Sequence, residues 1–189
     1  GKKWNDDEYL QSTLSIDQVT RDISVMKSYS DLVDTLKSFL SIGVILVDGK
    51  HLRRKLAPIP ATCLACMKKV VFRMAKDLCA SSLDRLSVAS AALHAIPTDL
   101  EQFVAFNRAF KFWRLNMHSL TENRESCEQL FNLLKANGSK IPVEEMRSLE
   151  RLQTGTDTFI QETILEAVTL VQSKLPEFLK SFSSLSDQT

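Results

Sequence analysis

Apolar residues recur at alternating spacings of three and four along most of this chain. In the clearest run, ten positions between 103 and 134 keep the spacing 3, 4, 3, 4, 3, 4, 3, 4, 3 without a slip. The run comprises Phe103, Phe106, Phe110, Trp113, Met117, Leu120, Arg124, Cys127, Phe131 and Leu134. Arg124 is its only charged member. A repeat of about 3.5 residues places all these side chains on one face, so the pattern predicts a single long helix with a buried seam.

Both ends of this helix carry capping signals. Thr98 and Glu101 have the spacing of a capping box, in which each side chain satisfies a backbone amide of the first turn, so we expect the helix to begin at Asp99. Asn137 and Gly138 tolerate the left-handed backbone conformation that ends many helices. The predicted helix has about 38 residues and is roughly 57 Å long at about 1.5 Å per residue.

The same spacing predicts further helices over residues 5–40, 62–93 and 142–182. Ser28–Asp31 carries side chains that compete for backbone hydrogen bonds, and we expect it to divide the first of these helices into two. Pro142 should occupy the first position of the last helix, where proline is tolerated.

The stretch between the first two helices has a different character. Val44–Val47, followed by Asp48-Gly49, is typical of a strand with a turn behind it, but one strand alone cannot form a sheet. Lys50–Leu56 predicts a short basic helix. Pro58 and Pro60 should then impose an extended linker.

These elements divide the chain into three parts. Residues 1–41 are an N-terminal helical segment, residues 42–61 hold the short turn, the basic helix and the Pro-containing linker, and residues 62–189 form a long-helix bundle. The connection over residues 137–141 is so short that the two helices it joins should be antiparallel neighbours. We therefore predict an all-α fold, an elongated bundle of long antiparallel helices.

Charge and composition narrow the classes of partner. The 24 Lys and Arg residues nearly balance 23 Asp and Glu residues, for a formal net charge of +1. Such a chain has no strong positive field to gather phosphate backbones, so we expect no nucleic-acid partner. No stretch approaches the roughly 18 apolar residues of a membrane span, and we expect no membrane partner. Because the chain begins with Gly1 rather than Met, we expect either an artificial terminus or a fragment excised from a longer protein.

Motifs of catalysis and nucleotide binding match the sequence only in part. In Gly43–Lys50, five residues instead of four separate the two glycines of a phosphate-binding loop, and His51 supplies no hydroxyl for magnesium. His51, His94 and His118 have no Ser or Cys partner in a recognisable nucleophile motif. We expect that the chain is not an enzyme and has no catalytic or cofactor-binding residue.

The four cysteines lie in stretches of apolar periodicity. Cys63 and Cys66 have the spacing of a zinc or redox pair, and His51 and Cys79 complete four possible zinc ligands. The spacing of these four is nonstandard, and a redox pair needs a βαβ context that the pattern does not predict. We expect all four cysteines, Cys127 included, to be reduced and packed in the core. We expect no metal site, and we expect the chain to be in a reducing compartment.

Three arginines are the candidate partner-binding residues. Arg53 and Arg54 lie in a basic cluster at residues 51–55, which either contacts a partner's acidic surface or is a solvated helix face. Arg124 is costly at a core position unless it is paired or reaches water. It marks a register-setting pair, a contact with another chain, or a place where the seam rotates and exposes the arginine.

The order of several motifs resembles a known family. The motifs are, in chain order, Val47-Asp48 before the basic stretch, Thr98–Val104, Cys127–Leu134, the hinge Gly138–Pro142, and Glu144-Glu145 followed by Leu149 and Leu152. Over residues 42–182 they resemble the N-terminal tail of a dynein heavy chain, in the helical-bundle region before the linker of axonemal-type heavy chains. Residues 1–41 fit as a further tail helix.

The resemblance implies a non-catalytic tail or stem segment of a motor protein. Such helical bundles transmit force and assemble with other dynein heavy, intermediate or light chains, with adjacent bundles of the same heavy chain, or with docking sites. The resemblance also implies a location in the cytoplasm and cytoskeleton, in the axoneme of a cilium or flagellum. ATP hydrolysis and microtubule binding belong to other parts of such a motor.

Two other classes of protein remain open. A helical-bundle cytoskeletal or trafficking adaptor would share the long seam without any relation between the Gly138 hinge and dynein tails. A helical-bundle enzyme or metal protein requires inward Glu and Glu-x-x-His ligands, and no Glu-x-x-His occurs in the sequence.

Overall fold

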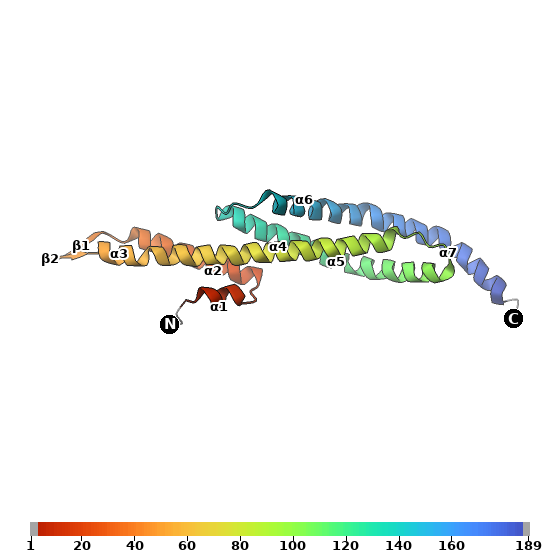
Figure 1. Ribbon diagram of the computed structural model, residues 1–189, viewed down its shortest axis with the longest axis horizontal. Helices are drawn as coiled ribbons and strands as arrows, with labels where there is room; N and C mark the ends of the chain where they lie inside the picture. Colours follow the sequence, from red (N-terminus) through yellow and green to blue (C-terminus); the bar gives the residue numbers. More distant parts are fainter. Residues whose placement is uncertain (1–3, 187–189) are drawn as a thin grey trace. The chain divides into compact units, whose positions relative to one another are not determined.

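The computed structural model describes residues 4–186, and most of them are helical. The helices are α1 (Asp6–Gln11), α2 (Ile16–Thr35), α3 (Lys50–Leu56), α4 (Pro58–His94), α5 (Leu100–Ala136), α6 (Val143–Thr158) and α7 (Ile164–Ser186). A π-helical turn, η1 (Phe159–Thr163), joins α6 to α7. Figure 1 shows these elements along the chain. The helical class predicted from the apolar spacing is confirmed.

The chain divides into two compact units. Unit 1 comprises Gly1–Ala75 and Gln129–Ile141, and unit 2 comprises Lys76–Glu128 and Pro142–Thr189. The helices α4 and α5, of 37 residues each, contribute to both units. The two divisions predicted from the sequence, after residues 41 and 61, both fall inside unit 1.

A β-hairpin in unit 1 departs from the sequence prediction. Strand β1 (Phe39–Ile42) pairs antiparallel with β2 (Ile45–Asp48), so that the first residue of each strand pairs with the last residue of the other. The two-residue turn between them begins with Gly43, whose φ of 62° favours glycine. The sequence analysis expected the strand-like stretch to have no partner strand, and this was wrong. The residues from Phe39 onward, which were assigned to a helix face, form its partner strand β1.

The extended linker predicted at Pro58 and Pro60 is not observed. Helix α3 ends at Leu56 and α4 begins at Pro58 itself, so Pro60 lies in the first turn of α4. An amide in the first turn has no helical partner four residues earlier, so a proline there loses no helix hydrogen bond. The prediction was wrong because both prolines were treated as helix breakers, which they are in a helix interior.

Helix α2 is also continuous where a break was predicted. The Ser28 hydroxyl donates a hydrogen bond to the carbonyl oxygen of Val25 at 2.8 Å, so it does not compete with the helix for backbone amides. The break lies earlier, between α1 and α2. There the Ser15 hydroxyl caps α2 by accepting a hydrogen bond from the Gln18 amide at 3.2 Å.

Helix α5 begins one residue later than predicted, with a different set of capping hydrogen bonds. The Asp99 carboxylate accepts a hydrogen bond from the Gln102 amide at 2.8 Å, and the Gln102 side chain accepts one from the Thr98 amide at 3.1 Å. Asp99 is therefore the N-cap, the Gln102 side chain reaches back to Thr98 rather than to the Asp99 amide, and α5 begins at Leu100 instead of opening with the predicted box of Thr98 and Glu101.

Helix α5 ends at the predicted cap. Gly138 has a φ of 66°, and the amides of Gly138 and Ser139 donate to the carbonyl oxygens of Lys135 and Leu134, both at 3.0 Å. These two bonds form a Schellman motif. No atom lies within 4 Å of a Cβ built on Gly138, so glycine is favoured there by its backbone angle rather than by space.

Each unit has its own buried apolar residues. Those of unit 1 include Val19, Ile23, Met67, Val70, Val71, Leu130, Phe131 and Leu134. The core cluster of unit 2 comprises Leu86, Ala89, Leu93, Phe106, Phe110, Trp113, Leu120, Phe159, Ile164 and Ala167. Every residue of the predicted α5 seam is buried except Met117 and Arg124, so the seam is confirmed. Among the described helices, none is both long and apolar enough to cross a membrane.

Contacts in unit 2 give the local directions of three helices. Between α4 and α6 the residue numbers of both partners rise together, so these helices run parallel; the pairs are Lys76 with Glu145 and Leu86 with Gly155. Between α5 and α6 one number rises as the other falls; the pairs are Arg124 with Asp157 and Glu128 with Gln153. At these contacts α5 therefore runs antiparallel to α6.

Substituting Gly155 tests the close approach of α4 and α6. A Cβ built on Gly155 lies 2.8 Å from Leu86 Cδ2, and Leu86 is buried, so an alanine forces Leu86 to shift. We expect Gly155→Ala to lower the free energy of unfolding by about 1 kcal/mol, although alanine otherwise favours a helix by a similar amount. In a Leu86→Val background, which lacks the Cδ atoms, Gly155→Ala should raise the free energy of unfolding. Urea denaturation measures both effects, and equal effects in the two backgrounds would contradict the contact.

Candidate functional site

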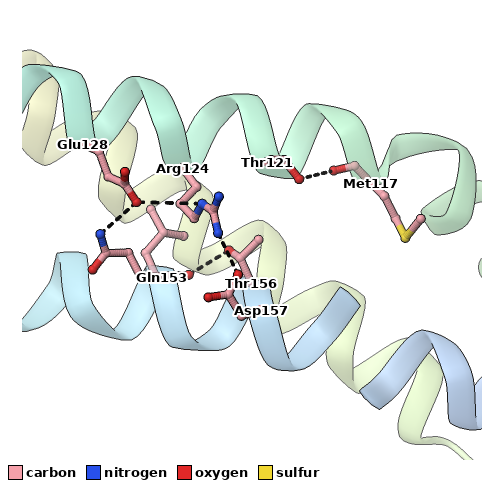
Figure 2. A network of polar contacts seen from close by, with 8 residues as sticks. Met117, Thr121, Arg124, Glu128, Gln153, Thr156 and Asp157 are labelled. Atoms are coloured by element: carbon pink, nitrogen blue, oxygen red, sulfur yellow. Dashed lines mark hydrogen bonds and ion pairs between the residues drawn. The ribbon is translucent and has the colours of Figure 1, made fainter. Parts of the chain in front are cut away.

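Arg124 is the charged member of the α5 seam, and it lies against α6 in unit 2. Its Nη1 donates a hydrogen bond to Asp157 Oδ1 at 2.6 Å. Its Nε lies 3.8 Å from Glu128 Oε1, one turn further along α5. The Arg124 side chain is 22% exposed, whereas the Asp157 side chain is 55% exposed. Figure 2 shows the guanidinium between these two carboxylates.

The network continues from Glu128 back to α6. Glu128 Oε1 accepts a hydrogen bond from Gln153 Nε2 at 2.8 Å. The buried Thr156 hydroxyl donates to the carbonyl oxygen of Leu152 at 2.7 Å, so it has a partner within its own helix. Asp157, Arg124, Glu128 and Gln153 therefore form one row, with two side chains from each helix (Figure 2).

The geometry of this row favours one register of α5 against α6. Arg124 Nε is buried and makes no hydrogen bond with any described residue, so the charge depends on the two neighbouring carboxylates. A slip of α5 along α6 would leave a largely buried guanidinium without Asp157, which is costly. The structure thus pairs Arg124 with Asp157 within the chain while leaving the arginine partly exposed, and both its register-setting role and its role toward a partner stay predictions.

The other two predicted arginines lie in unit 1, on α3. Arg53 Nη2 is 3.3 Å from Asp34 Oδ1 on α2, and both side chains are well exposed, so this ion pair contributes little to stability. Arg54 is exposed. The structure brings neither of them into the network of Arg124, which belongs to unit 2. Partner binding by Arg53 and Arg54 stays a prediction.

All four cysteines are free and buried, as expected for packing residues. In unit 1, burial and then the charge of Asp6 raise the pKa of the Cys63 and Cys66 thiols. In unit 2, a hydrogen bond with Cys79, followed by burial, raises the pKa of the Cys127 thiol. Within residues 4–186 no three His, Cys, Asp or Glu side chains form a group suited to a metal ion.

A cavity of about 380 Å³ in unit 2 was not predicted from the sequence. It lies where α4 faces α6, η1 and α7, next to Gly155. Its polar lining includes Ser87, Ser90, His94, Arg151, Thr158, Glu162, Thr163 and Glu166. His94 Nδ1 donates to the Ser90 carbonyl oxygen at 2.7 Å. The available sequence signal was Gly155, because glycine in a helix interior often marks a close approach.

A polar contact between α1 and α2 was also not predicted from the sequence. The Tyr9 hydroxyl donates a hydrogen bond to Asp22 Oδ2 at 2.9 Å. Burial, then this hydrogen bond and the Asp22 charge, raise the pKa of the Tyr9 hydroxyl well above its usual range. Tyr9 therefore remains a donor at neutral pH. No spacing rule links two residues on separate helices, so the sequence carried no signal for the pair.

Two comparisons with known proteins, one with family models and one with curated proteins, were made for this chain. No protein-family model matches the chain, and no curated protein matches it. The chemistry of the site therefore has to be argued from its residues. Paired charges and an amide in a helix–helix seam position two helices, and they supply no activated nucleophile in the described network.

Removing Asp157 should expose the dependence of Arg124 on its partner. Asp157→Ala leaves Arg124 with only the 3.8 Å contact to Glu128, and we expect a loss of about 1 kcal/mol in the free energy of unfolding. The double variant Arg124→Met/Asp157→Ala removes the charge but keeps an unbranched side chain, so it should recover most of that loss.

Denaturant unfolding measures these changes against a matched control. Glu144→Gln removes the carboxylate of an exposed pair with Arg147 and should change the free energy of unfolding by less than about 0.5 kcal/mol. A double variant no more stable than Asp157→Ala would show that the charge of Arg124 does not depend on Asp157.

The buried thiols should react slowly with Ellman's reagent at neutral pH. Cys63 and Cys66 are 2% and 5% exposed, and their raised pKa leaves less thiolate than an ordinary cysteine has. Urea should release all four thiols to fast reaction. Because the folded pKa values of Cys63 and Cys66 are raised, these two thiols stabilise the fold below the ordinary pKa of 9.0, and this contribution is lost as the pH rises above it. Fast reaction of Cys63 or Cys66 in the folded protein would contradict their burial.

Proposed function

We propose that this chain is a non-catalytic helical scaffold that transmits force and assembles with other proteins. The observation that carries the proposal is the register-setting row of Arg124, Asp157, Glu128 and Gln153. A scaffold under load has to resist the sliding of one helix past the next. Apolar side chains in a heptad seam exchange neighbours after a slip, whereas a partly buried charge loses its partner.

The proposed architecture is an elongated bundle of long antiparallel helices. The two helices of 37 residues support it, because helices in globular proteins average only about 10–14 residues. At about 1.5 Å per residue each is roughly 55 Å long. The local antiparallel contact of α5 with α6 also supports it. This length suits an arm or a docking surface better than an enclosed active site.

We further propose that the scaffold is a tail or stem segment of a dynein heavy chain. The support is the motif order over residues 42–182, in which the basic stretch forms α3 and Gly138 caps α5. Glu144 and Glu145 lie in the first turn of α6, with Leu149 and Leu152 buried behind them. The proposed partners are dynein heavy, intermediate or light chains and adjacent bundles of the same heavy chain, in the axoneme of a cilium or flagellum.

A second candidate is a helical-bundle cytoskeletal or trafficking adaptor. The outward side chains of α5 favour it, since Phe112 and Leu115 are 55% and 83% exposed and offer a surface for another protein. An adaptor would use the same register-setting row to keep that surface straight, without belonging to a motor.

Affinity capture separates the two candidates. We expect residues 1–189, used as bait in an extract of ciliated cells, to enrich dynein chains or docking factors over an unrelated helical bundle, identified by mass spectrometry at low and moderate salt. The variant Arg53→Glu/Arg54→Glu should capture less, because it reverses an exposed basic cluster. Recovery of membrane-traffic or actin proteins without any dynein component would overturn the dynein proposal and favour the adaptor.

A further inference from the structure

The outward side of α5 combines exposed apolar and basic side chains. Val104, Phe112 and Leu115 are 42%, 55% and 83% exposed. Arg108 and Lys111 are exposed beside them. We call these five residues the α5 outer face.

The five side chains form a continuous surface on one side of the helix. Val104, Arg108 and Phe112 follow one another at intervals of four, and Lys111 and Leu115 form a neighbouring row at the same interval. The other side of this stretch holds core residues of unit 2, among them Phe106, Phe110 and Trp113. The α5 outer face therefore points away from that core.

The charge of this stretch has one sign. From residue 102 to residue 121 the sequence contains Arg108, Lys111 and Arg114 but no Asp or Glu. All three side chains are exposed, and none forms an ion pair with a residue that the structure describes. The positive charge beside the exposed apolar side chains is therefore not neutralised by the described part of the chain.

We propose that the α5 outer face is a docking site for an acidic amphipathic helix of a partner protein. Apolar residues of the incoming helix would cover Val104, Phe112 and Leu115, and its carboxylates would pair with Arg108 and Lys111. Phe112 and Leu115 are the main apolar contacts of this site, with Lys111 at its margin and Arg108 between apolar side chains. The proposal rests on the scaffold function proposed above and adds to it the surface and the chemistry of the partner.

A helix fits this face better than a lipid surface does. Arg108 lies between Val104 and Phe112 in one row, so a basic side chain interrupts the apolar strip. A helix that lies in a membrane surface keeps its apolar face continuous and carries its basic residues at the margins. The core contacts of the opposite side also prevent α5 from rotating. Interleaved apolar and basic positions are typical of helix–helix contacts, where long basic stems pack over apolar neighbours.

The test measures binding of a defined peptide to the full chain. The probe is a fluorescein-labelled peptide of three heptads with Leu at the a and d positions and Glu or Ala elsewhere. There are two control peptides. One has the same composition in shuffled order, and the other has Lys in place of Glu. We expect fluorescence anisotropy to give micromolar binding for the acidic amphipathic peptide, weakened by added salt, and much weaker binding for both controls.

Variants of the chain locate the binding surface. Leu115→Asp should raise the dissociation constant at least about tenfold, and Lys111→Glu should also weaken binding. The matched control is Leu165→Asp on α7, because Leu165 is 64% exposed but lies between Glu162 and Glu166. This control should leave the dissociation constant unchanged. Circular dichroism checks that each variant keeps its helical content.

Four results would overturn the docking site. The first is that the shuffled peptide binds as tightly as the acidic amphipathic peptide, and the second is that Leu115→Asp leaves peptide binding unchanged. The third is that the face binds vesicles of phosphatidylcholine and phosphatidylserine in preference to the peptide. The fourth is that light scattering shows self-association of the chain through Leu115.

The outcome of this test is separable from that of the capture experiment. Peptide binding without capture of dynein chains contradicts only the dynein proposal, and capture without peptide binding contradicts only the docking site.

Discussion

An arginine in an apolar seam is costly unless an opposite charge or water meets it, and in unit 2 this constraint links α5 to α6. Arg124 meets it through Asp157, and Glu128 carries the contact back to Gln153. Because both helices contribute two members, the row matches Asp157 and Gln153 of α6 to Arg124 and Glu128 of α5. The leucine and phenylalanine positions of the seam then bury their surface in that register, since apolar contacts alone permit several.

The ends and irregularities of the helices adapt to this packing. The Schellman motif at Gly138 ends α5 and lets the chain turn into α6 after a few residues. Further along, Gly155 allows Leu86 to approach the backbone of α6, and the π-helical turn η1 follows four residues later. A π-turn shifts the phase of a helix, so the side chains of α7 are re-aimed relative to those of α6. The cavity beside Gly155 lies at this shift.

The inward and outward sides of α5 serve different purposes. The inward side is occupied by aromatic core residues and by the charge row, which together hold the helix in place. The outward side keeps Phe112 and Leu115 exposed among basic residues. A rigidly held helix presents such a surface without an ordering cost on binding, which favours docking of a partner. The buried cysteines and the Tyr9–Asp22 contact stabilise the units in the same way, through packing and hydrogen bonding.

The sequence by itself determined the features that depend on neighbouring residues. The 3.5-residue repeat gave the long α5 seam, and Asn137-Gly138 gave its end, because spacing and capping act within a turn or two. Only the tertiary structure decided the partner of Arg124, the pairing of β1 with β2, the helical start at Pro58, and the approach of Leu86 to Gly155. Three of these features depend on contacts between residues far apart in the sequence, and the fourth depends on the position of Pro58 within its helix. The local sequence pattern does not determine either.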